Sequence, residues 1–288
     1  MVKSPNMKDF EDFPLSPRGS VNAAEFYESF LQCEELAKNF PKKELGKDPN
    51  LTFYNLLQEV HSARSVNPAL FRKRIDANKA LSMLWLSRVR ETAQVFVALN
   101  EIPCFNGLTP DDLSKLSKLS RDTANLCKLA GILLEFGIVL IYERSIPGMK
   151  LDGAVFNLSP DRPVIALSLR YARLDIFWFT LMHELAHVVL HHEKLSAPIL
   201  DDMDEVHDDL VEKQADRLAS DSLVSRSAWR SCNAKYSQTE NTIKEFAAQV
   251  GVHPSIVAGR LQKELNRYDV FSKIVNEVDV RKVLLSYE

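Results

Sequence analysis

The sequence predicts an α+β protein that is mostly helical and contains a small three-stranded sheet. Long stretches on both sides of the middle of the 288-residue chain place apolar side chains at helical spacing. Between residues 138 and 171 the spacing changes to the alternation that is typical of strands. The segment that follows, residues 177–192, is apolar on nearly every side, which predicts a buried helix.

The N-terminal part of the chain is predicted to be helical after a short tail. Residues 1–20 combine prolines, a glycine and alternating charges, which predicts a flexible tail. Residues 22–39 have apolar side chains at helical spacing and begin at Asn22, a good capping residue. A second helix is expected near residues 53–62, and we interpret residues 21–110 as one helical N-terminal region.

A long helix predicted over residues 70–98 carries a cluster of cations. Its basic side chains are Arg72, Lys73, Arg74, Arg88 and Arg90. They could form a basic surface for a partner, but a solvated face is the simpler interpretation, because charged residues ordinarily occupy the solvent side of a helix. Further helices are expected from Pro110 and over residues 121–136, where Gly137 stands in a C-cap position.

Three strands are predicted next, over residues 138–143, 152–158 and 163–171. In the third strand, the even-numbered residues are expected to share one face and the odd-numbered residues the other.

The apolar segment after the strands contains His183, Glu184 and His187 in the pattern H-E-x-x-H. Two histidines four residues apart lie on one face of a helix, so both rings can reach one metal ion. Glu184 stands beside the first histidine and can face a water molecule as general base. The alternative is a pair of core histidines that match the pattern by chance, and a third ligand decides between the two.

Two parts of the sequence offer a third ligand. His191 lies one further turn along, but three ligands in line on one straight helix cannot converge on one ion; we expect it near the helix C-terminus, where a cation suits the dipole. Glu193 follows it. The better candidate is Glu212, which has Asp216 four residues later in a stretch with helical spacing. In this arrangement the glutamate binds zinc and the aspartate accepts a hydrogen bond from the far nitrogen of a ligand histidine.

The sequence therefore predicts one Zn²⁺ per chain, held by His183, His187 and Glu212, with Asp216 behind one of the histidines. The alternative for Glu212 and Asp216 is an incidental acidic pair on a solvated helix face. Two imidazoles and one carboxylate are the donor set of hydrolytic zinc sites, which keep a fourth position for water.

The segment from residue 147 to residue 229 resembles the ImmA/IrrE family of zinc metallopeptidases. It is most similar to the peptidase region of HigA-like regulators, without their N-terminal helix-turn-helix. The residues that carry the resemblance are Pro147-Gly148, Leu151-Asp152-Gly153-Ala154, the run from Pro163 to Tyr171, Arg173-Leu174-Asp175, the run from Phe177 to Leu181, the H-E-x-x-H motif, Asp201-Asp202, Glu212, Ala215, Asp216 and Ala219. The resemblance implies a minimal, gluzincin-like zincin domain, which we assign to residues 111–231. In that fold the last strand before the site is an edge, where substrate adds as a strand.

The resemblance also implies a function. It indicates a hydrolase, a zinc-dependent endopeptidase in which Glu184 is the catalytic base. Its expected substrate is a regulatory protein on a separate chain, a transcriptional repressor or an antitoxin, so the expected roles are transcription regulation or a toxin–antitoxin system. The alternative is a non-proteolytic, antitoxin-like interaction protein that retains the zinc fold. The intact Glu184 argues against this alternative, since a purely structural site has no use for it.

The C-terminal part is predicted to be a helical region over residues 232–288 with a helix-turn-helix-like motif at residues 243–263. Its second helix offers only Arg260 and Lys263 as cations, so direct DNA binding is not expected, because DNA binding requires phosphate neutralisation. Residues 271–288 are expected to close the chain as one packed helix. The stretch between the two ligand segments, residues 193–209, is acidic and is interpreted as a solvated connector; the alternative is an element that covers the site or selects a basic substrate.

Composition bounds the location of the protein. The net charge of −3 gives no electrostatic case for nucleic acid, and the apolar content of 45% is enough for a sizeable core. Four cysteines are scattered without a C-x-x-C pair, which suits a reducing cytoplasm. There is neither an apolar run long enough for a membrane span nor a secretory signal, so we expect a cytoplasmic protein.

Overall fold

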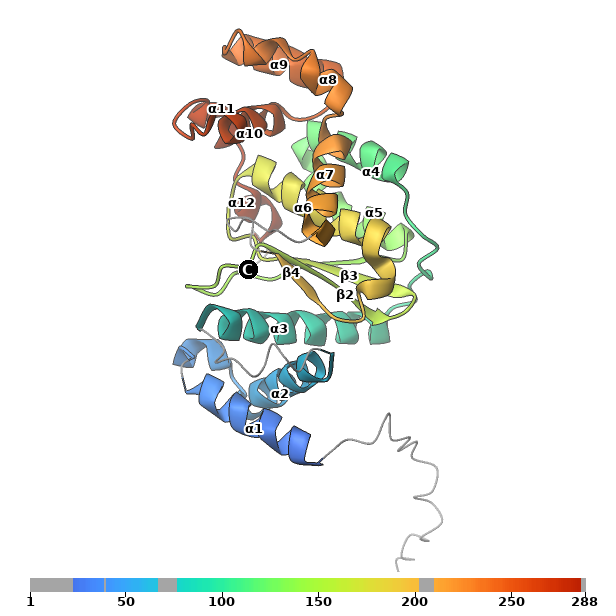
Figure 1. Ribbon diagram of the computed structural model, residues 1–288, viewed down its shortest axis with the longest axis vertical. Helices are drawn as coiled ribbons and strands as arrows, with labels where there is room; N and C mark the ends of the chain where they lie inside the picture. Colours follow the sequence, from blue (N-terminus) through green and yellow to red (C-terminus); the bar gives the residue numbers. More distant parts are fainter. Residues whose placement is uncertain (1–22, 39, 67–76, 202–209, 286–288) are drawn as a thin grey trace, which may run out of the picture.

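A four-stranded mixed sheet lies between two groups of helices in the computed structural model of the chain (Figure 1). The structure describes residues 23–38, 40–66, 77–201 and 210–285. The tail predicted over residues 1–20 lies outside the described residues. Within them no helix is both long enough and apolar enough to cross a membrane.

The strands follow the order β1-β3-β2-β4 across the sheet. They are β1 (Val139–Tyr142), β2 (Gly153–Ser159), β3 (Arg162–Leu167) and β4 (Ile199–Asp201). β1 runs parallel to β3, whereas β2 is antiparallel to both β3 and β4. The α+β, mostly helical fold class is confirmed. The prediction of three strands is wrong, because β4 lies in the segment interpreted as a connector and is too short to show alternation.

The position of β3 also corrects an expectation. The last strand before the H-E-x-x-H helix was expected to be an edge, yet β3 pairs with β1 on one side and with β2 on the other. The two edges of the described sheet are β1 and β4. β4 reaches the edge because it pairs with the first three residues of β2, from Gly153 to Val155. The edge closest to the start of β2 is therefore β4.

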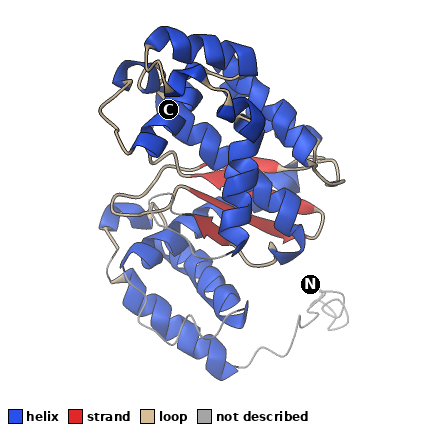
Figure 2. Ribbon diagram, turned by 45° about the horizontal axis from the view of Figure 1, so that its top comes forward, coloured by secondary structure: helices blue, strands red, loops and turns tan. Residues whose placement is uncertain are grey.

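Helices cover both faces of the sheet (Figure 2). On one face α3 (Ala77–Leu99) lies next to the sheet, and α2 (Pro49–Val66) and α1 (Ala23–Ala37) lie beyond α3. The other side carries α4 (Pro110–Ser117), α5 (Leu129–Glu135), α6 (Leu174–His191), α7 (Leu210–Leu223), α8 (Arg226–Arg230), α9 (Glu240–Val250), α10 (Pro254–Leu265), α11 (Ser272–Val275) and α12 (Val280–Leu284). Gly137 ends α5 as predicted. Its φ of 79° is one that residues with a side chain rarely adopt.

Alternating residues of β3 belong to two different cores. Val164 and Ala166 pack into a core shared with α1, α2 and α3, whereas Ile165 and Leu167 pack into a core shared with α6. This confirms the predicted alternation and explains why the strand is apolar on both faces. Trp85 of α3 is fully buried in the first core and donates its indole N–H to the carbonyl of Glu143, 3.1 Å away.

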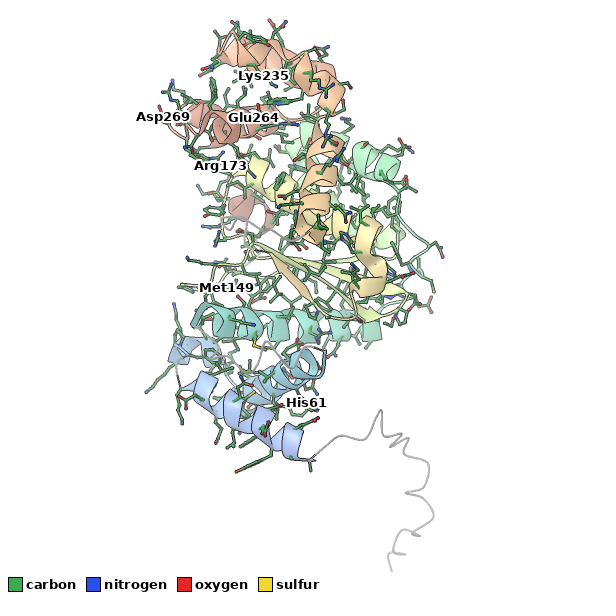
Figure 3. All side chains as sticks on the ribbon, in the orientation of Figure 1. His61, Met149, Arg173, Lys235, Glu264 and Asp269 are labelled. Atoms are coloured by element: carbon green, nitrogen blue, oxygen red, sulfur yellow. The ribbon has the colours of Figure 1, made fainter. Side chains whose placement is uncertain are left out.

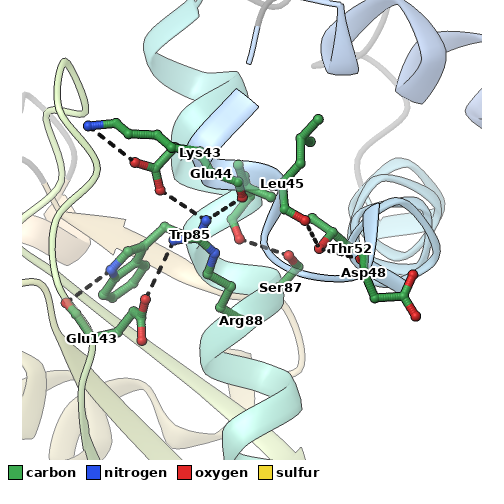
Figure 4. A network of polar contacts seen from close by, with 10 residues as sticks. Lys43, Glu44, Leu45, Asp48, Thr52, Trp85, Ser87, Arg88 and Glu143 are labelled. Atoms are coloured by element: carbon green, nitrogen blue, oxygen red, sulfur yellow. Dashed lines mark hydrogen bonds and ion pairs between the residues drawn. The ribbon is translucent and has the colours of Figure 1, made fainter. Parts of the chain in front are cut away.

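The cations of α3 are not on a solvated or partner-binding face, which corrects that prediction for Arg88 and Arg90. Arg88 pairs with Glu44 at 3.0 Å and with Glu143 at 3.7 Å (Figure 4). Arg90 pairs with the buried Glu59 and lies 4.3 Å over the ring of Phe156 in β2. A buried carboxylate needs a partner, so these pairs join α2, α3 and the sheet. Residues 72–74 lie outside the described residues.

Both cations of α10 that were considered for DNA binding make contacts within the protein. Arg260 of α10 donates to the carbonyl of Val224 at 3.0 Å and lies 4.3 Å over the ring of Trp229. Lys263 lies 5.1 Å from the ring of Phe179 in α6. Figure 3 shows Glu264 facing Lys235, and these two residues pair at 3.8 Å.

The C-terminal stretch does not form the single helix predicted over residues 271–288. It forms α11 and α12, separated by a break at residues 276–279. Asp279 caps α12 by accepting a hydrogen bond from the backbone N–H of Lys282 at 3.2 Å, so the chain starts a new helix there. Residues 286–288 lie outside the described residues.

Candidate metal centre

The helix that carries H-E-x-x-H, α6, is buried along most of its length because its sequence is apolar on nearly every side. The chain enters it through a tight turn after β3, in which Leu169 adopts a φ of 51°. That conformation costs about 1–2 kcal/mol for a residue with a side chain. Arg281 of α12 donates its Nε–H to the carbonyl of Leu169 at 2.7 Å, and the N–H of Val280 donates to the carbonyl of Ala172 at 2.8 Å. The C-terminal helix thus holds the turn that positions α6.

The structure brings together His183, His187 and Glu212. The Nε2 atoms of the two histidines are 3.0 Å apart. Glu212 Oε2 lies 3.2 Å from the Nε2 of His183 and 3.4 Å from that of His187. All three residues are buried, with exposed fractions of 2%, 0% and 8%. Three side-chain atoms that could bind a metal ion therefore meet at one buried point.

These distances fit a tetrahedral zinc ion. Zinc bonds to nitrogen and oxygen ligands are about 2.0–2.1 Å long, so two ligand atoms of a tetrahedral site lie roughly 3.3 Å apart. The three separations, 3.0, 3.2 and 3.4 Å, lie close to that value. The three residues are a candidate metal site with the donor set of a hydrolytic zinc centre.

Helix α7 supplies the third donor because it packs beside α6 (Figure 1). Glu212 stands in its first turn, and Asp216 follows one turn later. The carboxylate of Asp216 lies 3.0 Å from the Nδ1 of His183, on the far side of the ring from Glu212. The spacing of these two acids along α7 matches the spacing from which the sequence predicted them.

The second histidine of the pair has a different neighbour. The Nδ1 of His187 lies 3.2 Å from the Nδ1 of His191, which is the last residue of α6 as expected. The Nε2 of His191 lies 3.0 Å from the Oε1 of Gln214 in α7. Sequence reasoning missed Gln214, because its contact depends on how α6 and α7 cross rather than on any spacing within one helix.

Glu184 points from α6 toward the start of β2. It is fully buried, and its carboxylate lies against Gly153. A Cβ atom added at Gly153 would lie 2.8 Å from the Cδ of Glu184 and 3.0 Å from the Cγ2 of Thr180. The absence of a side chain at Gly153 therefore makes the space that Glu184 occupies. Gly153 is among the residues that carry the family resemblance, but no sequence pattern predicts this role.

An ion pair flanks this glycine. The side chain of Asp152 is only 3% exposed and lies 3.0 Å from the Nε of Arg170, whose Nη2 is also 3.0 Å from the second carboxylate oxygen. Such a bidentate ion pair fixes the orientation of both side chains. It holds the first residues of β2 against the turn that leads into α6.

A mixed sheet, a buried H-E-x-x-H helix and a glutamate from a second helix together define a metallopeptidase domain of minimal zincin architecture with a candidate zinc site. Residues 134–262 match the family described as the IrrE N-terminal-like domain. This part of the chain, which contains the whole candidate metal site, thus belongs to the ImmA/IrrE family of metallopeptidases. A comparison with curated proteins finds no match.

Proposed function

We propose that the protein is a zinc-dependent endopeptidase that cuts a regulatory protein, with Glu184 as general base. The observation that carries this proposal is the set of three buried donor atoms at tetrahedral spacing, with a glutamate beside the first histidine. A structural site would satisfy zinc with four protein ligands, whereas the three donors found among the described residues leave one position for water. The donor set therefore favours a hydrolytic site.

The roles of the residues follow from their places. His183, His187 and Glu212 would hold the ion, which when bound polarises a water and the scissile carbonyl. Glu184 accepts a proton from the attacking water and delivers it to the leaving amine. Asp216 accepts a hydrogen bond from the Nδ1–H of His183, which fixes the tautomer that leaves Nε2 as donor.

The sheet edge beside Glu184 supports an extended peptide as substrate. β4 is an edge strand, and its partner β2 begins at Gly153, against which Glu184 lies. An edge strand offers unpaired backbone groups to which a peptide can add as a further strand. A peptide bound there would lie next to β4, which separates it from Gly153 and from the carboxylate that moves the proton by one strand.

The substrate class rests on the family. We propose a transcriptional repressor or an antitoxin on a separate chain as the protein that is cut. The second candidate is a partner-holding protein that keeps the zinc fold without cutting. Glu184 separates the two, because neither the fold nor the three metal donors require a carboxylate at that position.

The experiment compares the parent protein with Glu184→Gln. The soluble proteome of cells that lack the gene is incubated with each protein, and new protein N-termini are identified by mass spectrometry. Because Gln keeps the shape but removes the base, we expect parent-specific termini to fall about 10²–10⁴-fold with the variant. Glu245→Gln, an exposed acid on α9, is the matched control and should behave as the parent. Termini that do not depend on Glu184 would contradict the proposal and favour the partner-holding candidate.

A further inference from the structure

The two metal-binding histidines have unlike outer partners. His183 has a carboxylate, Asp216, at its Nδ1. His187 has at its Nδ1 the ring of His191, and beyond that ring the amide of Gln214. The sequence singled out His191 as a poor ligand, and neither the metal donor set nor the proposed proton transfer uses it.

His187, His191 and Gln214 form a row of two hydrogen bonds, which we call the relay. When His187 binds a metal, the donors and acceptors of the relay can be arranged in only one way. The Nε2 of His187 is the atom that faces His183 and Glu212, so it must keep its lone pair for a metal and its Nδ1 must carry the proton. His187 then donates from Nδ1, and His191 accepts at its own Nδ1. A neutral imidazole that accepts at Nδ1 carries its proton at Nε2. His191 therefore donates to the Oε1 of Gln214, which can only accept.

Two packed helices, α6 and α7, carry the three side chains of the relay. His191 lies one helical turn after His187 on the same helix, so the separation of their rings is set by α6. His191 is 6% exposed and His187 is fully buried, so water has little access to the bond between them. Gln214 comes from α7, two residues after Glu212, so the helix that supplies the third metal donor also supplies the end of the relay.

We propose that His191 and Gln214 are positioning residues that set the tautomer and the ring orientation of His187 for metal binding. The inference rests on the proposed use of this site for zinc. His183 is oriented by a charged acceptor and His187 by a neutral one, so the site gains a second fixed ring without a further negative charge. His191 holds His187 in place and is not itself a metal ligand.

The test measures zinc affinity rather than cleavage. The zinc dissociation constant of each purified full-length protein is determined by competition with a chromophoric chelator. Outer partners of ligand histidines typically change metal affinity 10–100-fold, so His191→Phe should raise the dissociation constant by about that factor. Gln214→Ala should raise it less, because Gln214 lies at the surface, where water can accept the bond. Gln214→Glu, which keeps an acceptor and adds charge, should bind zinc at least as tightly as the parent.

The matched control is His192→Phe. His192 is the next residue along the chain, and its ring stacks on Phe105 at 4.9 Å, outside the relay. This variant should keep the parent affinity for zinc. Nitrogen-15 NMR of the zinc-loaded parent gives a signature that a merely structural role would not produce. It should show His187 protonated at Nδ1 and His191 protonated at Nε2.

An unchanged dissociation constant for His191→Phe, or the opposite tautomer of His191, would overturn the relay. A loss of zinc as complete as that of His187→Ala would overturn it too, because His191 would then be a ligand. If His191→Phe fails to fold, the comparison of Gln214→Ala with Gln214→Glu decides. A parent protein that binds no zinc would contradict the proposed function itself, whereas zinc binding insensitive to His191 contradicts only the relay.

Discussion

Gly153→Ala should disable the proposed general base, Glu184, while leaving the candidate metal site in place. The Cβ of alanine would lie 2.8 Å from the Cδ of Glu184 and would overlap its carboxylate. Carbon atoms pack at about 3.5–4.0 Å, so the carboxyl group must retreat by roughly 1 Å. The backbone at Gly153 does not need a positive φ, so strain of the strand is not the cause of the effect.

The size of the effect follows from this displacement. A misplacement of about 1 Å can cost on the order of 10²-fold in rate, and complete loss of general-base action costs 10²–10⁴-fold. We therefore expect the cleavage rate to fall about 10²-fold. The end of a glutamate side chain moves easily, so the variant should fold and keep its zinc.

The assay follows the rate of cleavage of the substrate identified through Glu184→Gln, together with zinc content and melting temperature. Gly131→Ala is the matched control, because a Cβ added at Gly131 meets no atom within 4 Å. It lies in helix α5, where alanine should stabilise the protein by up to about 1 kcal/mol without changing the rate. A Gly153→Ala protein that retains the parent rate would refute the placement of Glu184 against β2.

Three further predictions concern other contacts. Asp216→Ala should weaken zinc binding about 10–100-fold, measured by chelator competition; an unchanged affinity would remove its role behind His183. Arg90→Met should lower the free energy of unfolding by about 3 kcal/mol in urea titrations, since it leaves the buried Glu59 without its cation, and a loss below 1 kcal/mol would show that this pair does not hold α2 to α3. Burial raises the pKa of the Cys33 thiol to about 12. At pH 8 a thiol reagent should therefore modify the exposed Cys104 rapidly and Cys33 only after unfolding, and equal modification rates of the two thiols would contradict the packing of α1.

The candidate metal donors could be predicted because their geometry is local. His183 and His187 are placed by one helix, and Glu212 and Asp216 by another, so two spacings of four residues suffice to find them. What the sequence does not contain is the crossing of the two helices. The contact between His191 and Gln214, and the closeness of Glu184 to Gly153, arise only from that packing.

The errors in the fold have a similar origin. β4 has three residues and is stabilised by its pairing with β2, so no alternation within it could reveal a strand. Charged residues such as Arg88 and Arg90 ordinarily lie on the solvent face of a helix. They face the interior here because they pair with Glu44 and Glu59, which the sequence of the helix does not reveal. By contrast, the two faces of β3 could be predicted, because successive side chains of a strand point to opposite sides of the sheet.

The central claim is that His183, His187 and Glu212 together hold one zinc ion. Elemental analysis of the purified full-length protein and of Glu212→Ala, at equal zinc supply, tests it directly. We expect one zinc per chain in the parent and strongly reduced occupancy in the variant, with the circular dichroism spectrum unchanged. Full occupancy in Glu212→Ala would contradict the claim, because the third ligand would then have to come from another residue.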